Sequence, residues 1–173
     1  MSVGLVLGGA RCLFADLRAF CRLGVNPDAI IAVNYAGVVF PGRLDHWVTL
    51  HPANFRIWEP ARLGPHGYIR WGPTEHPNVD RVMPYTGPGS SGLFATLLGL
   101  DELGLDRIAL AGMPMDAQGN VDGRARWPDK EVGLHREGWA RALDRIDGRV
   151  LSMSGWTREL LGAPTAAWMK EVA

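Results

Sequence analysis

Short apolar runs alternate with amphipathic stretches along this chain of 173 residues. Each run is four or five residues long and is bounded by glycine or polar residues, which is typical of buried strands. Strands that are apolar along their whole length belong to parallel sheets covered on both faces. The pattern predicts five such strands: Gly4–Leu7, Ala29–Val33, His46–Leu50, Ile108–Ala111 and Val150–Met153.

Helical periodicity fills several of the stretches between these strands. The predicted helices are Arg11–Leu23, Ser91–Leu103, Lys130–Ile146 and Trp156–Leu161. Glycine follows the first two, at Gly24 and Gly104, where helices commonly end. The alternation of strands and helices predicts an α/β fold. We expect one three-layer, Rossmann-like domain over residues 1–173, with a mostly parallel sheet.

The middle of the chain, from Ala53 to Pro84, is rich in proline, glycine, tryptophan and histidine and has poor periodicity. We predict that loops dominate it, with short strands possible around Tyr68–Trp71 and Val79–Met83. Four tryptophans fall in or near loop-like segments: Trp47, Trp58, Trp71 and Trp127. Flat rings in such places can line a ligand cleft.

Composition and charge argue against several partners. The 18 basic and 18 acidic residues balance, and the basic ones are scattered, so nucleic acid and anionic membrane surfaces are not indicated. No run has the roughly 18 apolar residues of a membrane helix, and the first residues do not resemble a signal peptide. Cys12 and Cys21 fall in one predicted helix, too far apart for a disulfide, which favours reduced thiols and a cytoplasmic location. The oligomeric state stays open.

The segment from Tyr85 to Asp116 is the most informative about chemistry. Its glycine- and serine-rich turn, Gly87–Gly92, leads directly into the apolar helix at Ser91. Backbone N–H groups of such a turn, with the helix dipole behind them, attract phosphate or carboxylate. An ordinary loop with an N-cap serine is the equal alternative for a short motif of this kind.

Small or polar residues also gather where the predicted strands end, which is the edge at which open parallel sheets bind ligands. The candidate nucleotide-binding residues are Gly8, Gly9, Arg11, Asn34, His51, Pro52, Ser90, Ser91, Gly92 and Asp116. Arg11 can neutralise a phosphate by a bidentate contact. Asp116 can hold a ribose hydroxyl or magnesium, or can simply form a turn. Polar strand ends also occur because they meet solvent, but the whole set favours a site.

Several common motifs are missing from the sequence. The first turn reads GGARCL instead of Gly-x-Gly-x-x-Gly, and Asn34 stands where a dinucleotide-binding fold has an acidic residue. A Walker phosphate loop and a Gly-x-Ser-x-Gly elbow do not occur. The four histidines of the middle region, His46, His51, His66 and His76, match no common zinc spacing, so we predict no metal site.

Four motifs in order resemble the family 42 sialyltransferases and their Rossmann-like relatives, which include proteins similar to archaeal 6-hydroxymethylpterin pyrophosphokinase. The motifs are VLGGARCL, AVN, WVTLHP and SSG followed by LGLDRIALAGMPMD. The resemblance implies a cytidine-type nucleotide or nucleotide sugar as substrate and a glycosyltransferase-like reaction. It assigns nucleotide contacts to Gly8, Gly9, Asn34, His51–Pro52 and Ser91–Gly92, and it assigns the role of general base to His135.

Two other functions stay open beside this one. A pyrophosphokinase-like transfer onto a pterin would need magnesium and carboxylates, for which the strand ends offer Asp116 and Asp122. A non-catalytic nucleotide-binding module is favoured by the short length and by Tyr68 and Tyr85, which precede the Ser-Gly turn instead of following it. The first turn also departs from the family, with Ala-Arg-Cys in place of Gly-Pro-Ser. His135 also has an ordinary interpretation, since a histidine on an apolar helix face usually packs.

Overall fold

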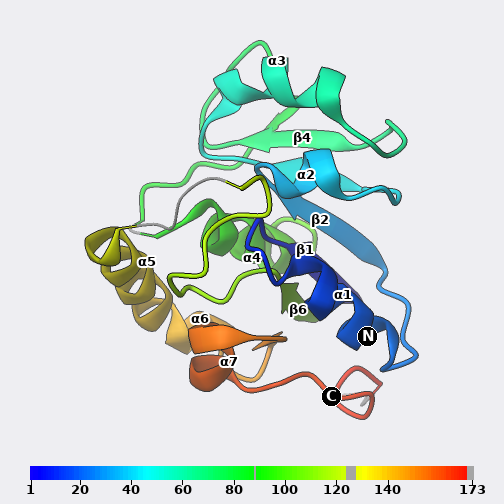
Figure 1. The fold of residues 1–173 in the computed structure, drawn as a ribbon, viewed down its shortest axis with the longest axis vertical. Coiled ribbons are helices and arrows are strands. Elements are labelled where there is room, and N and C mark those ends of the chain that lie inside the picture. The colour runs from blue at the N-terminus through cyan, green and yellow to red at the C-terminus, as the bar shows by residue number, and fades with distance from the viewer. Residues whose placement is uncertain (88, 124–127, 171–173) are drawn as a thin grey trace.

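The computed structural model describes residues 1–87, 89–123 and 128–170. Within these ranges seven strands form one all-parallel sheet in the order β5-β4-β3-β2-β1-β6-β7. The strands are β1 Val3–Leu7, β2 Ala29–Val33, β3 His46–Val48, β4 Ile69–Gly72, β5 Arg81–Val82, β6 Arg107–Ala111 and β7 Val150–Ser152. The predicted α/β class with a parallel sheet is confirmed (Figure 1).

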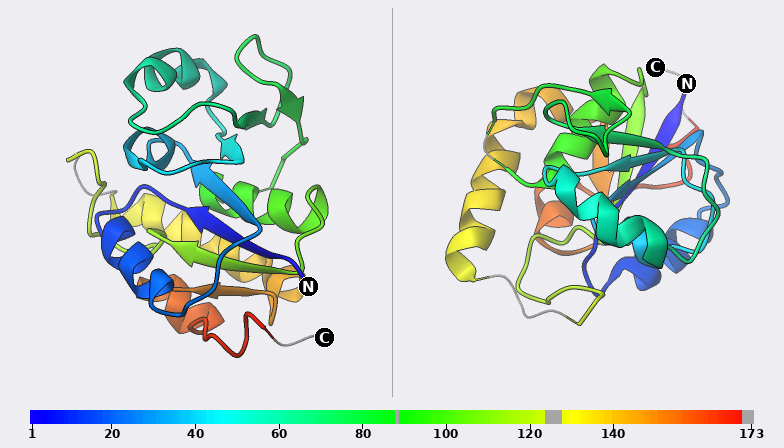
Figure 2. Two further views of the ribbon diagram at one scale, coloured as in Figure 1. Left: turned by 90° about the vertical axis from the view of Figure 1, so that its right-hand side faces the viewer. Right: turned by 90° about the horizontal axis from the view of Figure 1, so that it is seen from above.

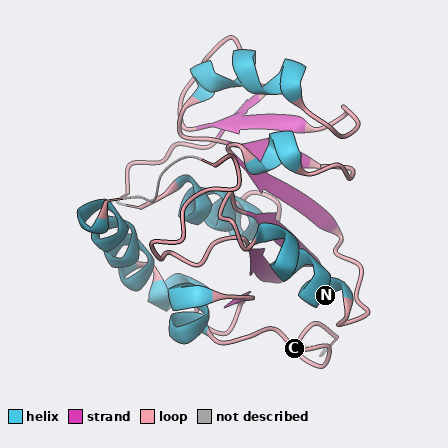
Figure 3. Ribbon diagram, viewed as in Figure 1, coloured by secondary structure: helices cyan, strands magenta, loops and turns pink. Residues whose placement is uncertain are grey.

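Helices lie on both sides of this sheet (Figure 3). They are α1 Leu13–Cys21, α2 Ala36–Val39, α3 Phe55–Trp58, α4 Ser91–Asp101, α5 Asp129–Arg141, α6 Leu143–Ile146 and α7 Gly155–Leu161, with 3-10 turns η1 Pro52–Asn54 and η2 Glu59–Ala61. The four predicted helices are present, although the one predicted over Lys130–Ile146 is divided into α5 and α6. Pro88, in the glycine-rich turn, and Trp127 lie outside the described residues. Among the described residues no helix has the length and apolar character to cross a membrane.

Alternate residues of the central strands belong to two separate hydrophobic cores. Val6 and Ile31 face the core that α4, α5 and α6 cover, whereas Leu7 and Ala32 face the core under α1, α2 and α3. This alternation is the two-residue period of a strand buried on both faces. In the right-hand view of Figure 2, α1 (blue) and α4 (green) lie on opposite sides of the central strands. The result is the three-layer arrangement expected from the sequence.

The middle segment is more ordered than its poor periodicity predicts. It contains α3 and two 3-10 turns, and the short strands expected around Tyr68–Trp71 and Val79–Met83 are present as β4 and β5. The interpretation of its tryptophans as cleft-lining rings was wrong for the described ones, because Trp47, Trp58 and Trp71 are all buried. Trp47 stacks on Trp58 with ring centroids 6.3 Å apart, and Phe55 packs edge-on against both. These aromatic rings build a core over the outer strands instead of a ligand site.

The strand order places a topological switch point beside β1. The chain proceeds from β1 to β2 and outward to β5 on one side, then crosses back through α4 to β6 on the other side of β1. The helices that follow β1 and β6 pack on different faces of the sheet, since Leu13 and Phe20 of α1 belong to one core and Trp139 of α5 belongs to the other. A crevice outside the strand ends is expected where the chain reverses its direction across the sheet in this way. In open α/β sheets, ligands bind in this crevice at the carboxyl ends of the strands.

Candidate functional site

A cavity of about 360 Å³ opens at this switch point. Ligand pockets for small molecules have volumes of about 300–1,000 Å³, so this one is large enough for a small ligand. Eight predicted site residues are among those that line it: Gly8, Gly9, His51, Ser90, Ser91, Gly92, Asp116 and His135. They come from five separate places in the chain, namely the segments that follow β1 and β3, the start of α4, the segment that follows β6, and α5. The fold thus brings distant predicted residues onto one cavity.

The glycines after β1 and β6 are required by their contact with each other. A Cβ on Gly8 would lie 2.4 Å from the Gly112 carbonyl oxygen, and a Cβ on Gly112 would lie 2.4 Å from the Gly8 carbonyl oxygen. Gly112 also has a φ of +70°, which favours glycine. Gly9 differs, because among the described residues the only atom within 4 Å of its added Cβ would be the Ala36 nitrogen, at 3.9 Å. The fold itself therefore leaves room for a side chain at Gly9.

The N-terminus of α4 forms another wall of the cavity. Ser90 is the N-cap, and its hydroxyl oxygen accepts a hydrogen bond of 3.4 Å from the Leu93 N–H. Ser91 and Gly92 occupy the first helical turn, as predicted, where backbone N–H groups have no intrahelical carbonyl to bind. The Ser91 hydroxyl accepts a bond of 3.4 Å from the Leu50 N–H, which ties the helix start to the end of β3. The helix dipole makes this wall favourable for an anion.

Gly92 is small for a reason that the sequence motif does not reveal. A Cβ at this position would lie 2.5 Å from the Met113 sulfur, and the Cβ of Gly8 would lie 2.2 Å from Met113 Cγ. Met113 is buried and lies between the first glycine turn and the helix N-terminus. Both glycines thus accommodate a packed methionine side chain. This contact explains both glycines without a ligand. A larger residue at Gly92 would disturb the packing of Met113, so a change in affinity in such a variant would not by itself show a ligand contact.

His135 and Asp116 are two of the titratable side chains that line the cavity, and they come from α5 and from the segment that follows β6. His135 in α5 is half-buried, and burial lowers the pKa of its imidazole, with a smaller opposing effect of Glu131. Its neighbour one turn later, Trp139, is fully buried in the core, whereas His135 lines the cavity. Asp116 accepts bonds from the Gln118 backbone N–H and side-chain amide at 3.1 and 2.9 Å, so it also closes a local turn.

Residues 119–121, which the sequence did not assign to the site, pair with residues 9–11 of the glycine turn that follows β1. The Val121 N–H donates to the Gly9 carbonyl at 2.8 Å, and the Arg11 N–H donates to the Gly119 carbonyl at 3.2 Å. Asn120 and Ala10 form an isolated β-bridge. Gly119 and Asn120 accordingly line the cavity. These backbone pairs join residues about a hundred positions apart, and no periodicity in the sequence signals them.

Three predicted site residues are not among the described residues that line the cavity: Arg11, Asn34 and Pro52. The Arg11 side chain is exposed. Asn34 takes a φ of +50° after β2, and its side-chain oxygen accepts the Thr49 hydroxyl at 2.8 Å, while its carbonyl accepts the Trp47 indole N–H at 2.7 Å. These bonds give Asn34 a role in the turn between β2 and α2.

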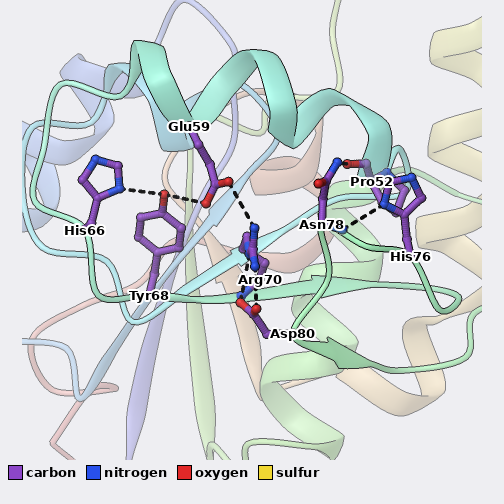
Figure 4. A network of polar contacts seen from close by, with 8 residues as sticks. All are labelled: Pro52, Glu59, His66, Tyr68, Arg70, His76, Asn78 and Asp80. Atoms are coloured by element: carbon purple, nitrogen blue, oxygen red, sulfur yellow. Dashed lines mark hydrogen bonds and ion pairs between the residues drawn. The ribbon is translucent and has the colours of Figure 1, made fainter.

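Pro52 and three histidines of the middle region, His46, His66 and His76, have their contacts in the outer part of the sheet. Figure 4 shows Pro52 accepting a bond from the Asn78 side chain, at 3.4 Å, and places His66 and His76 at opposite ends of this network. His46 accepts the Trp71 indole N–H on Nδ1 at 3.1 Å. His66 lies 3.2 Å from the Tyr68 hydroxyl and His76 accepts the Asn78 N–H at 3.1 Å, so these three histidines each have a local partner. In the described part of the chain no group of three or more histidine, cysteine or acidic side chains is placed to hold a metal ion.

The cysteines are free, and the one near the site is not activated. Burial raises the pKa of the Cys12 thiol to about 12. The nearby Asp16 carboxylate also raises this pKa, whereas the hydrogen bond between Cys12 and Ser154 lowers it. A thiol with this pKa stays protonated and is a poor nucleophile at neutral pH.

A second cavity of about 480 Å³ lies between α4, α5, α6 and the segment that follows β5. Its lining includes Tyr85, Leu97, Asp101, Arg141 and Arg145. Arg145 and Asp101 form an ion pair of 2.6 Å at its rim, and both are substantially exposed. It contains none of the predicted site residues, so the cavity at the switch point remains the better candidate.

Comparison with protein-family models, curated proteins and solved structures gives no match to this chain.

Proposed function

We propose that this protein binds a nucleotide or nucleotide sugar in the cavity at the switch point and is a small glycosyltransferase-like enzyme. The observation that supports this most is the convergence of Gly9, Ser91, Asp116 and His135 on one cavity at the carboxyl edge of a parallel sheet. In this proposal the start of α4 holds the phosphate, because its first N–H groups and the helix dipole favour negative charge. The segment that follows β6, which carries Asp116, holds the sugar hydroxyls.

The cavity also offers a surface for the rest of such a ligand. Val33, Leu50, Met113, Met115 and Val132 contribute apolar side chains to its lining. A mostly apolar pocket with a few convergent polar groups is the usual form of a small-molecule site. In the proposed complex a heterocyclic base packs on these side chains while the phosphate reaches the start of α4.

His135 is the proposed general base of the transfer. The lowered pKa of its imidazole favours the neutral form at pH 7, which is the form that accepts a proton from an acceptor hydroxyl. As the acceptor oxygen forms its bond to the sugar, the bond from sugar to phosphate breaks, and the negative charge stays on the phosphate. That charge develops beside the N-terminus of α4, where backbone dipoles stabilise it.

Binding is tested by calorimetric titration with CMP, CDP, UDP, GDP and ATP against the wild-type protein and Gly9→Val. Gly9 lines the cavity and has room for a Cβ, so G9V should fold and should block the ligand. We expect at least one nucleotide to bind the wild-type protein and to bind G9V about tenfold or more weakly. Gly133→Ala is the matched control, because Gly133 lies in α5 with open space around it and does not line the cavity. If G9V and the wild-type protein bind equally, the ligand lies elsewhere.

The catalytic role is tested separately with His135→Ala. We expect turnover to fall by roughly 10²- to 10⁴-fold, the range of a general base, with little change in nucleotide affinity. Leu134→Ala on the exposed side of the same helix controls for effects on α5. A histidine that only packs predicts the reverse: lower thermal stability with activity per folded molecule retained. Nucleotide binding without any transfer activity would instead favour the non-catalytic module.

A further inference from the structure

The loop after β6, Gly112–Asp116 (the β6 loop), forms one wall of the cavity with all five of its residues. It contains two positive φ angles, +70° at Gly112 and +48° at Met115. A non-glycine residue such as Met115 adopts this conformation only where the surroundings hold it. The supports of the β6 loop therefore determine the shape of this wall.

The first support is Asp16, which lies in α1. Its Oδ2 accepts the Gly112 N–H at 2.8 Å and the Ser154 hydroxyl at 2.7 Å. The Asp16 side chain is buried, with only 6% of the residue exposed. A buried carboxylate needs such donors, and hydrogen bonds to it are stronger than those between neutral groups. Asp16 thus fixes the point at which the chain leaves β6.

The second support is Thr157, which lies in α7. Its fully buried hydroxyl donates to the Met113 carbonyl at 2.6 Å and lies 2.8 Å from the Ser152 hydroxyl. The start of α7 also touches the β6 loop, because a Cβ on Gly155 would lie 2.3 Å from the Pro114 side chain. Thr157 thus fixes the residue next to Gly112.

A third contact links the β6 loop to the helix that carries His135. Arg136 donates from Nε to the Met115 carbonyl at 2.8 Å, and its guanidinium lies 5.2 Å from the Trp156 ring centroid. The β6 loop is therefore attached to α1, α7 and α5 through side chains on its backbone groups. Asp16 and Thr157 are not among the described residues that line the cavity, so their influence on a ligand passes through the loop backbone.

We propose that Asp16 and Thr157 are positioning residues that hold the β6 loop in its ligand-binding conformation before a ligand arrives. This inference rests on the proposed function, because the β6 loop is a wall of the proposed nucleotide site. A loop that is already ordered loses less conformational entropy when a ligand binds, which strengthens binding without a new contact.

The first test needs no ligand. Amide hydrogen exchange, followed by NMR, compares Gly112 with Ile108, whose N–H donates to the Arg149 carbonyl at 2.9 Å within the sheet. In Asp16→Ala we expect Gly112 to exchange about 10- to 100-fold faster relative to Ile108, because its charge-assisted bond is lost. Asp16→Asn keeps an acceptor oxygen and should restore most of the protection. An unchanged ratio in D16A would overturn the proposal.

The second test measures CMP affinity by calorimetry at a temperature where every variant is folded. We expect D16A and Thr157→Val to bind CMP about tenfold more weakly, while D16N and Thr157→Ser stay close to the wild-type protein. Equal CMP affinity in D16A and the wild-type protein would remove the positioning role even if the exchange of Gly112 changed. Should D16A not fold, the T157V and T157S pair is judged by the same exchange ratio and the same titration.

The two hypotheses fail in different ways. If the wild-type protein binds no nucleotide, the proposed function is wrong, whereas the exchange ratio still decides whether Asp16 and Thr157 hold the β6 loop. If the wild-type protein binds CMP and the exchange ratio does not respond to D16A, the proposed function stands and the positioning role is wrong.

Discussion

Met113 should determine what happens when a methyl group is added at Gly92. A Cβ on Gly92 would lie 2.5 Å from the Met113 sulfur, well inside the normal contact distance. Met113 is only 3% exposed, so it has little room to turn away. We expect Gly92→Ala to lower the free energy of unfolding by about 1–3 kcal/mol, the usual cost of overpacking. The better helix propensity of alanine, up to about 1 kcal/mol, offsets only part of this cost.

A double-mutant cycle with Met113→Ala isolates this contact. M113A alone should cost about 2–5 kcal/mol, because a buried side chain is removed. In the M113A background, G92A should be nearly neutral or stabilising, which corresponds to a coupling energy of about 1–3 kcal/mol. Gly8→Ala is the matched control: its Cβ would also lie 2.4 Å from the Gly112 carbonyl oxygen, so M113A cannot fully relieve it.

The assay is urea denaturation followed by tryptophan fluorescence, which gives the free energy of unfolding of each variant in the cycle. A coupling energy within about 0.5 kcal/mol of zero would refute the packing argument. Gly92 would then have no structural reason to be glycine, and the ligand contact suggested by the sequence motif would become its best explanation.

Two further predictions concern the outer half of the sheet. Gly37→Ala should destabilise the fold by about 1–3 kcal/mol or more, since its Cβ would lie 2.1 Å from the buried Trp47 ring. Urea denaturation that shows G37A to be as stable as the wild-type protein would contradict this prediction. His46 should make stability fall as the pH drops below its unfolded pKa of about 6.5, because burial lowers its native pKa and only the unfolded state then takes up the proton. His46→Asn keeps an acceptor for the Trp71 indole and should reduce this loss of stability between pH 7 and pH 5. Part of the loss should remain, because the native pKa of His135 is also lowered. Equal pH dependence of stability in H46N and the wild-type protein would exclude His46 as a source.

The sheet and the location of the cavity were predictable because they depend on local patterns. Apolar runs closed by glycine mark buried parallel strands, and the carboxyl ends of parallel strands meet at one edge. Gly9 and Ser91 could therefore be assigned to a common edge from the sequence alone. The start of α4 at Ser91 followed from the serine and glycine before an apolar helix.

Other features depend on contacts between distant residues and could not be predicted in this way. Trp47 lies in a predicted strand and its ring was interpreted as lining a cleft, but the ring fills the space that Gly37 leaves open, and its indole N–H donates to the Asn34 carbonyl. Asn34 was predicted to contact the nucleotide because it follows a strand. Its positive φ, which gives it a role in the turn, leaves no periodic signal in the sequence. The support of Gly112 by Asp16 joins residues 96 positions apart, and an acidic residue in the first turn of a helix is otherwise explained by the helix dipole.

The central claim is that the cavity at the switch point binds a nucleotide. It is tested most directly by NMR titration of the ¹⁵N-labelled protein with CMP and the other nucleotides, which reports each backbone amide separately. We predict saturable shifts concentrated at Gly9, Ser91, Gly92 and Gly119, with little change at Tyr85 and the rest of the second cavity. Shifts confined to the second cavity, or no saturable shift with any of the nucleotides, would contradict the account.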